Sequence, residues 1–192
     1  MKKIFALVVL AIASLSAAAG DFYVGGSLGY MHEGSKYSEN GFSPSTNSIS
    51  ILPEIGYNLN EKWAVGTVIG YNYMHYCGQD LSGHMFQVSP YARYTYFRSS
   101  SNLISLFVDG GVEFGAGWTS YSDESSKTAC IYGLGFRPGL SINIAENFSF
   151  VTHVGFIGYK GANNAAKASG YGTKAGVSLN SNDITFGFYY NF

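Results

Sequence analysis

Apolar and polar residues alternate with a period of two in eight segments of the chain, and this pattern predicts β-strands. The segments lie at about residues 22–30, 49–59, 63–73, 86–96, 104–118, 132–143, 148–156 and 184–192. With their flanks they have about 10–18 residues, which is long for a strand in a water-soluble protein but suits a tilted bilayer crossing. None of these segments has a helical period, so we expect an all-β domain.

The connections between the expected strands alternate between long and short. Polar loops are expected at residues 35–47, 77–83, 120–128 and 160–182, and part of the last one can extend the final hairpin. Short turns are expected at residues 58–62, 99–102 and 145–147. Long loops at one end and short turns at the other are typical of an outer-membrane β-barrel. An even number of strands then places both ends of the domain on the short-turn side.

Alternation alone leaves open whether the apolar face points inward, as in a soluble lipocalin-like barrel, or outward into lipid. Charged residues make up 12% of the chain, about half the usual ~25%, and the polar face carries mainly Gly, Ser, Asn and Thr. A soluble barrel would need many more charges outside. The composition therefore favours lipid outside and a polar, glycine-rich lumen inside. The fold class that we expect is an all-β, eight-stranded, antiparallel, up-and-down transmembrane β-barrel.

Aromatic residues of the apolar face gather near the ends of the expected strands, as an interfacial girdle would. One group is expected near the short turns: Phe22, Tyr57, Trp63, Tyr94, Tyr96 and Phe148. The other is expected near the long loops: Tyr30, Tyr71, Tyr73, Trp118 and Tyr132. The aromatic content of 17% and a formal net charge of −1 also exclude a disordered chain and a nucleic-acid-binding protein.

The first 19 residues have the pattern of a cleaved secretory signal peptide. Lys2 and Lys3 precede the apolar run 4–13, and Ala17 and Ala19 fit a small-residue cleavage site. The uncharged stretch is shorter than the ~20 residues of a membrane-spanning helix. We therefore expect residues 1–19 to be removed and residues 20–192 to form one barrel domain.

Two segments resemble a known family. Residues 184–192 (ITFGFYYNF) end on alternating aromatics and resemble the assembly signal of Gram-negative outer-membrane proteins, carried here by Phe188, Tyr190 and Phe192. Residues 56–66 (GYNLNEKWAVG) resemble the first periplasmic turn of small outer-membrane β-barrel domain proteins, which are related to the barrel of outer-membrane protein A and to porin-family barrels. The resemblance covers the exported chain. It implies an outer-membrane location and recognition by the barrel-assembly machinery.

Charged residues on the expected lumen face are few. They are Glu54, Arg93, Asp109, Glu113 and Arg137, joined by His153. Because a charge in a narrow lumen must be paired or solvated, and because Arg bridges carboxylates well, we expect a charge network that plugs the barrel. A narrow conducting path lined by the same groups is the alternative.

The candidate enzymatic chemistry is sparse. Serines are frequent, and His32, His75, His84 and His153 could act as bases, but no His-x-Ser-Asn pattern typical of lipid A deacylase barrels is present. No credible metal-ligand set accompanies His75 and His84, so neither a metal nor another cofactor is expected. A lipid-directed enzyme is therefore the third interpretation.

Cys77 and Cys130 lie near the long-loop end of the third and sixth expected strands. An exported protein favours a disulfide, but these strands are not neighbours and a bridge needs Cα atoms within about 7 Å. A possible disulfide and two free thiols both stay open.

The function that we expect is non-enzymatic, with a structural or surface-interaction role in the cell envelope. Outer-membrane lipid, the assembly machinery and an extracellular ligand of the long loops are the expected partners, and nucleic acid is excluded.

Overall fold

The computed structural model describes residues 22–34, 45–77, 81–121, 124–125, 128–168, 172–179 and 184–192. The expected signal peptide, residues 1–19, lies outside them. The strands are β1 (Phe22–Gly34), β2 (Ser45–Asn58), β3 (Trp63–Cys77), β4 (Leu81–Arg98), β5 (Ile104–Tyr121), β6 (Glu124–Ser125), β7 (Ala129–Ala145), β8 (Phe148–Val154), β9 (Phe156–Ala162), β10 (Lys174–Ser178) and β11 (Ile184–Asn191), with one short helix, α2 (Asn164–Ala168). In this part of the chain no helix has the length and apolar character needed to span a membrane.

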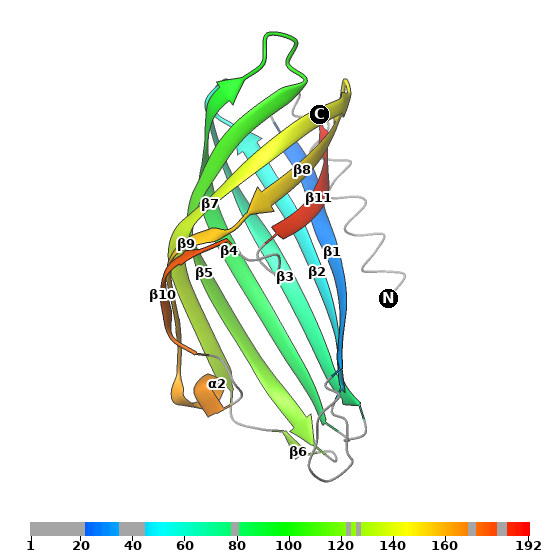
Figure 1. The fold of residues 1–192 in the computed structure, drawn as a ribbon, viewed down its shortest axis with the longest axis vertical. Helices are drawn as coiled ribbons and strands as arrows, with labels where there is room; N and C mark the ends of the chain where they lie inside the picture. Colours follow the sequence, from blue (N-terminus) through cyan, green and yellow to red (C-terminus); the bar gives the residue numbers. More distant parts are fainter. Residues whose placement is uncertain are drawn as a thin grey trace.

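The strands close into an antiparallel eight-stranded barrel, as expected (Figure 1). We call each of the eight barrel strands a stave, because two of them are divided into two numbered strands that lie end to end. β1 pairs with β2, β2 with β3, β3 with β4, and β4 with β5. β5 then pairs with β7, β7 with β8, β8 with β11, and β11 with β1, which closes the barrel. The seventh stave is divided into β8 and β9, which both pair with β7. The eighth is divided into β10, which pairs with β9, and β11, which pairs with β8.

Alternate residues point into the barrel, and the small ones make room for the large ones. Tyr23 of β1 lies opposite Gly56 of β2, where an added Cβ would come within 2.1 Å of the Tyr23 ring. Tyr91 of β4 lies opposite Gly66 of β3, where a Cβ would come within 2.5 Å of the Tyr91 hydroxyl. Such a narrow interior can hold a large side chain only if its neighbour across the strand pair is glycine.

The outward face is apolar, and aromatic contacts lie toward both ends. Near the short turns, the rings of Phe22 and Tyr57 and those of Trp63 and Tyr94 lie 4.8 Å apart. Toward the long loops, Tyr71 packs on Phe86 at 4.8 Å and His84 stacks on Trp118 at 5.2 Å. These contacts form two aromatic belts, an inner belt at the short-turn end and an outer belt at the loop end.

The expected orientation of Phe156 is wrong. Alternation through residues 148–156 assigned it to the outward face with Phe148, but Gly155 lies between β8 and β9 with a φ of 78°. Gly139 pairs with His153 and Gly135 pairs with Gly158, so the seventh stave has one extra residue there. This β-bulge reverses the alternation, and Phe156 points inward beside Lys160, whose Nζ is 4.8 Å from the ring centroid.

The expected loop at residues 160–182 is partly replaced by strands and a short helix. β9 continues to Ala162, and β10 extends the hairpin beyond β8 and β11, as the sequence allowed. Between them, the Asn163 side chain accepts hydrogen bonds from the amides of Ala166 (2.8 Å) and Cys130 (3.1 Å). Asn163 therefore caps α2 and attaches it to β7.

One strand pair of the barrel is only partly formed. β1 pairs with β11 at Tyr23 to Gly26, opposite Asn191 to Phe188, whereas β1 pairs with β2 over its whole length. The same register would place residues 27–30 opposite residues 187–184, yet these described residues are not paired. Figure 1 shows β1 continuing past β11, while β10 runs beside β9 on the other side of the barrel. We call the unpaired segments, residues 27–30 and 184–187, the seam.

Replacing Gly155 by Ala should destabilise the barrel. An Ala at a φ of 78° is strained, and its Cβ would lie 2.5 Å from the Ser178 carbonyl oxygen. The expected loss of unfolding free energy is about 1–3 kcal/mol, measured by urea denaturation in detergent micelles. Gly83→Ala is the control, because a Cβ there meets only Met74 at 3.8 Å. Equal stability of the two variants would contradict the bulge.

Candidate functional site

Polar and aromatic side chains fill the lumen toward the short-turn end. They comprise the ionisable group Glu54 (β2), Arg93 (β4), Asp109 (β5) and His153 (β8), with the rings of Tyr23, Tyr91, Phe107 and Tyr189 around it. We call these residues the lumen cluster. The residues of the lumen cluster come from six strands: β1, β2, β4, β5, β8 and β11. Its assembly therefore requires the closed barrel.

The centre of the lumen cluster is an ion pair between neighbouring strands. Arg93 and Asp109 are direct cross-strand partners in the register of β4 and β5. Arg93 Nε donates to Asp109 Oδ1 at 2.7 Å and Nη2 donates to Oδ2 at 2.9 Å, which is the two-pronged geometry of a strong pair. Asp109 is 1% exposed, so its charge depends on protein partners alone.

Further polar groups contact both members of the ion pair, Asp109 and Arg93. His153 Nε2 lies 2.8 Å from Asp109 Oδ2. Arg93 Nη2 also lies 3.5 Å from Glu54 Oε1. The Tyr91 hydroxyl donates to Glu54, and the Tyr23 hydroxyl lies 2.6 Å from that of Tyr91. Asp109 thus has hydrogen-bonding partners on two residues, and Glu54 has one hydrogen-bond donor and one ion-pair partner, as buried charges require.

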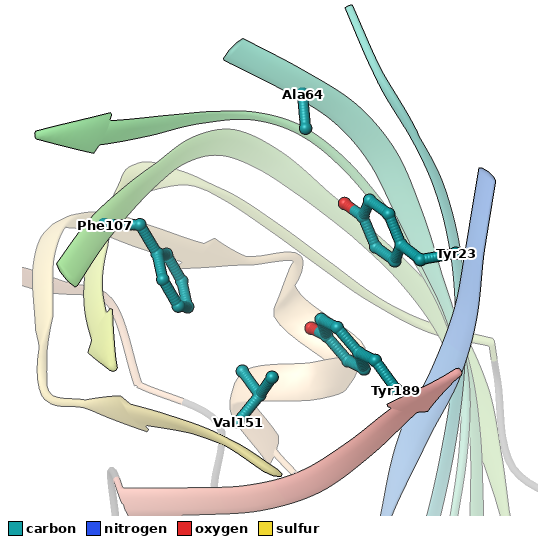
Figure 2. Close-up of a cluster of buried hydrophobic side chains, with 5 residues drawn as sticks. All are labelled: Tyr23, Ala64, Phe107, Val151 and Tyr189. Atoms are coloured by element: carbon teal, nitrogen blue, oxygen red, sulfur yellow. The ribbon is translucent and has the colours of Figure 1, made fainter. Parts of the chain in front are cut away.

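Aromatic rings enclose the guanidinium group of Arg93. Its Cζ is 3.9 Å from the centroid of Phe107, a close cation–π contact. Tyr189 accepts a hydrogen bond from Nη2 at 3.2 Å and stacks on Tyr23 with 5.2 Å between ring centroids. Figure 2 shows Tyr23, Phe107 and Tyr189 converging on the interior of the barrel, with Val151 between their strands. The rings exclude water from the ion pair.

The lumen charges expected from the sequence divide into groups. Glu54, Arg93 and Asp109 come together in the lumen cluster. Glu113 instead pairs with Lys160, whose Nζ is 3.4 Å from Oε2. Arg137 lies opposite Asp109 in the register of β5 and β7, but within the part of the chain that the structure describes it forms no ion pair.

Sequence reasoning missed the aromatic half of the lumen cluster. Tyr23, Tyr91 and Tyr189 all occupy the inward face, which otherwise carries mainly small and polar residues. Large rings on a small-residue face were the available signal, because such rings must fill space inside. Lys160 was missed because its strand was expected to be a loop.

A cavity of about 450 Å³ lies in the lumen on the loop side of the lumen cluster. We call it the outer cavity. Its wall includes Ser50, Asn72, Met85, Gln87, Ile131 and Lys174, together with the Glu113–Lys160 pair. Ser50 donates to Asn72 at 2.6 Å and Asn72 donates to Gln87 at 3.2 Å, so one wall is a chain of polar groups.

The possible disulfide is not formed. Cys77 and Cys130 are both free thiols, because β4 and β5 separate their strands. Cys77 instead accepts a hydrogen bond from Asn47 Nδ2 at 3.0 Å. Among the described residues, no group of three His, Cys, Asp or Glu side chains could hold a metal ion.

The C-terminal aromatics lie on the stave that completes the barrel. Phe188 and Tyr190 point outward and are 52% and 44% exposed. The Phe192 amide donates to the Phe22 carbonyl at 3.0 Å, and its ring lies 5.0 Å from that of Tyr190. This strand end therefore joins the two ends of the barrel at the inner belt.

Comparisons with known proteins agree with this architecture. The family model described as "Outer membrane protein beta-barrel domain" matches residues 5–192. Neisserial surface protein A has a similar structure, with a TM-score of 0.55 and 15% identity over 91% of this chain and 100% of that chain. Outer membrane protein OprG from Pseudomonas aeruginosa has a TM-score of 0.52 and 14% identity over 91% and 96%. A comparison with curated proteins finds no match. At these identities the structural likeness shows a shared fold.

Replacing Arg93 by Ala should destabilise the protein strongly, because Asp109 would stay buried without its main partner. We expect a loss of about 3–5 kcal/mol of unfolding free energy in urea denaturation. Arg98→Ala is the matched control, because Arg98 is exposed and its guanidinium donates to a turn carbonyl, that of Glu61. The control should change stability by about 0.5 kcal/mol or less. Similar losses in both variants would show that the Arg93 pair contributes little.

Proposed function

The chain belongs to the outer membrane protein β-barrel domain family, and from this premise we propose that it is a non-enzymatic envelope protein with a closed lumen and a structural or surface-interaction role. It is an outer-membrane protein, and its apolar outer face contacts the lipid bilayer. The proposal concerns what the barrel does there: it supports loops at the cell surface and does not conduct solutes.

The observation that carries the proposal is the lumen cluster. An eight-stranded barrel has an interior just wide enough for side chains. Arg93, its two carboxylate partners and the surrounding rings occupy that interior with direct contacts of 2.7–3.9 Å. Water or ions could pass only if buried, mutually satisfied charges separated, which carries a large desolvation penalty. This supports a plug at the periplasmic end, where the short turns lie.

The loop end supports the surface-interaction role. Polar segments at residues 35–47 and 120–128 join the long strands there. α2 is held to β7 through Asn163, whose Nδ2 also donates to the Thr128 carbonyl at 3.1 Å. Polar connections on a rigid barrel can present a binding surface to an extracellular ligand.

A narrow channel is the alternative function, and the outer cavity favours it. This cavity gives a polar path through the outer half of the lumen, lined by Asn72, Gln87 and the Glu113–Lys160 pair. Among the described residues, the obstacle to conduction is the lumen cluster. Whether the barrel conducts therefore depends on whether Arg93 leaves Asp109.

A lipid-directed enzyme has less support. Hydrolysis by a Ser–His pair needs a serine hydroxyl within hydrogen-bond reach of the histidine. His84 Nδ1 lies 2.8 Å from the Tyr71 hydroxyl, His32 Nδ1 lies 2.7 Å from Asn47 Oδ1, and His153 contacts Asp109. These contacts suit structural roles, two at the loop end and one inside the lumen cluster.

Conductance across planar lipid bilayers tests the plug. The purified protein should give no steady current, and the double variant Arg93→Ala with Phe107→Ala should give discrete openings, because it removes the ion pair and the ring beneath it. Arg98→Ala should remain silent. Steady, wide channels in the unaltered protein would contradict the proposal and favour the porin-like alternative.

We further propose that the barrel-assembly machinery recognises Phe188, Tyr190 and Phe192 on the closing strand. Removing Phe192 should lower the amount of folded protein in the outer membrane several-fold, measured by heat-modifiable gel mobility of membrane fractions. Phe97→Ala is the control, because Phe97 is an outward phenylalanine, 50% exposed, that lies on β4 and not on the closing strand. Equal folded amounts in both variants would count against the assembly signal.

A further inference from the structure

The outer face of the barrel carries an open groove of about 660 Å³ across β3, β4, β5 and β7. Trp63 and Tyr94 of the inner belt form its short-turn end, with 4.8 Å between their ring centroids. From there it extends into the apolar band as far as Pro90 and Leu134. We call it the β4–β5 groove, because these two strands form its floor.

A row of cross-strand partners explains why the surface is hollow there. Ala92 of β4 pairs with Gly110 of β5 at the centre of the row. Ala92 pairs on its other side with Val65, and Gly110 pairs with Phe136. Val65 and Phe136 are 41% and 57% exposed and project outward. Two of the smallest side chains therefore lie side by side between two large ones, and the outer face is recessed where a barrel would otherwise be convex.

The length and position of the β4–β5 groove match one leaflet of the bilayer. Tyr94 and Pro90 are four residues apart, which corresponds to about 13 Å of strand. One leaflet contributes about 15 Å to a hydrocarbon core of about 30 Å. Because the groove starts at the inner belt, the leaflet that it faces is the inner one.

A second copy of the chain fits this groove less well than an acyl chain does. In a closed dimer, two copies meet through the same patch of surface. The recessed floors formed by Ala92 and Gly110 would then face each other across a void, and the side chains that line a void lose their packing contacts. A single flexible chain can fill the same recess from one side.

The short-turn end of the β4–β5 groove has the polar groups that a lipid headgroup needs. Lys62 directly precedes Trp63 and is exposed, and its carbonyl accepts a hydrogen bond from the Thr95 amide at 2.8 Å, which holds this turn against β4. Arg98 Nη2 donates to the carbonyl of Glu61, so two cations accompany one carboxylate here. Among the described residues, no carboxylate forms an ion pair with Lys62. The Trp63 indole adds an N–H donor.

We propose that the β4–β5 groove holds one acyl chain of an anionic phospholipid of the inner leaflet, whose phosphate lies at Lys62 and the indole N–H of Trp63. Apolar contact retains the chain, and the lysine selects a charged headgroup. Ala92 and Gly110 adjoin Arg93 and Asp109 in the sequence, so the lipid covers the outer side of the strand pair that carries the central ion pair. This inference goes beyond the proposed structural role and does not depend on whether the barrel conducts.

Quenching of tryptophan fluorescence tests the proposal, because the chain has only two tryptophans. Trp118→Phe leaves Trp63 at the groove as the reporter. Trp63→Phe leaves Trp118 as the matched control, since both rings lie on the outer face at an aromatic belt and are 46% and 39% exposed. In phosphatidylcholine vesicles with a minor fraction of phosphatidylglycerol that has brominated acyl chains, Trp63 should lose more fluorescence than Trp118. With brominated phosphatidylcholine as the minor lipid in phosphatidylglycerol, the two losses should be equal.

Filling the groove separates a lipid site from general contact with the bilayer. With Trp63 as the reporter, Ala92→Phe should reduce its loss to that of Trp118. Ala116→Phe is the matched control, because Ala116 is also exposed and pairs with the outward Phe86, but lies outside the groove. Lys62→Gln should lower the preference for phosphatidylglycerol by about two- to fivefold, which is what an exposed ion pair contributes. Heat-modifiable gel mobility checks folding, and Ala92→Leu is the smaller substitution if the phenylalanine prevents it.

Three results would overturn the proposal. Equal losses at Trp63 and Trp118 in both lipid mixtures would mean that the groove contacts only bulk lipid. A larger loss at Trp63 that persists when position 92 is filled would place the lipid elsewhere. Protection of Trp63 from both brominated lipids would show that a second copy or another protein covers the groove.

Discussion

The bidentate pair between Arg93 and Asp109 is the interaction on which the interior of the barrel depends. Neighbouring strands bring the two residues into register, and burial removes the water that would otherwise solvate them. The remaining lumen cluster follows from this: His153 and Glu54 supply further polar contacts, and Phe107 and Tyr189 enclose the guanidinium. Because these contacts come from β2, β4, β5, β8 and β11, the pair also couples strands that share no hydrogen-bonded edge, such as β2 and β5 or β5 and β8.

The inner and outer halves of the barrel therefore differ in their strand pairing and in how far side chains fill the lumen. The inner half is fully paired around a filled lumen, with Tyr23 and Tyr189 stacked where β1 meets β11. The outer half contains the outer cavity, and its staves diverge at Gly26 and Gly155. The outer cavity therefore lies between the lumen cluster and the loop end of the barrel. This arrangement suits surface interaction better than transport.

Much of the fold could be predicted because alternation depends only on which face meets lipid. Eight staves, the outward aromatics and the inward positions of Glu54, Arg93 and Asp109 all follow from a period of two. Phe156 was assigned to the wrong face because the β-bulge at Gly155 depends on the backbone conformation of that one residue. The chain contains 25 glycines, so a glycine in the sequence does not by itself indicate a bulge. The partner of Glu113 was beyond sequence reasoning, since it depends on β9 extending past the bulge. The seam was equally hidden, because β1 and β11 have strand-like sequences on both sides of it.

A double-mutant cycle on the central pair tests this account most directly. Arg93→Met, Asp109→Leu and the double variant would be compared with the unaltered protein by urea unfolding in the same micelles. The account predicts a coupling energy of about 2 kcal/mol or more, with the double variant far more stable than the sum of the single losses implies. Additive losses would contradict it, because they would mean that Arg93 and Asp109 stabilise the barrel independently and do not organise its lumen.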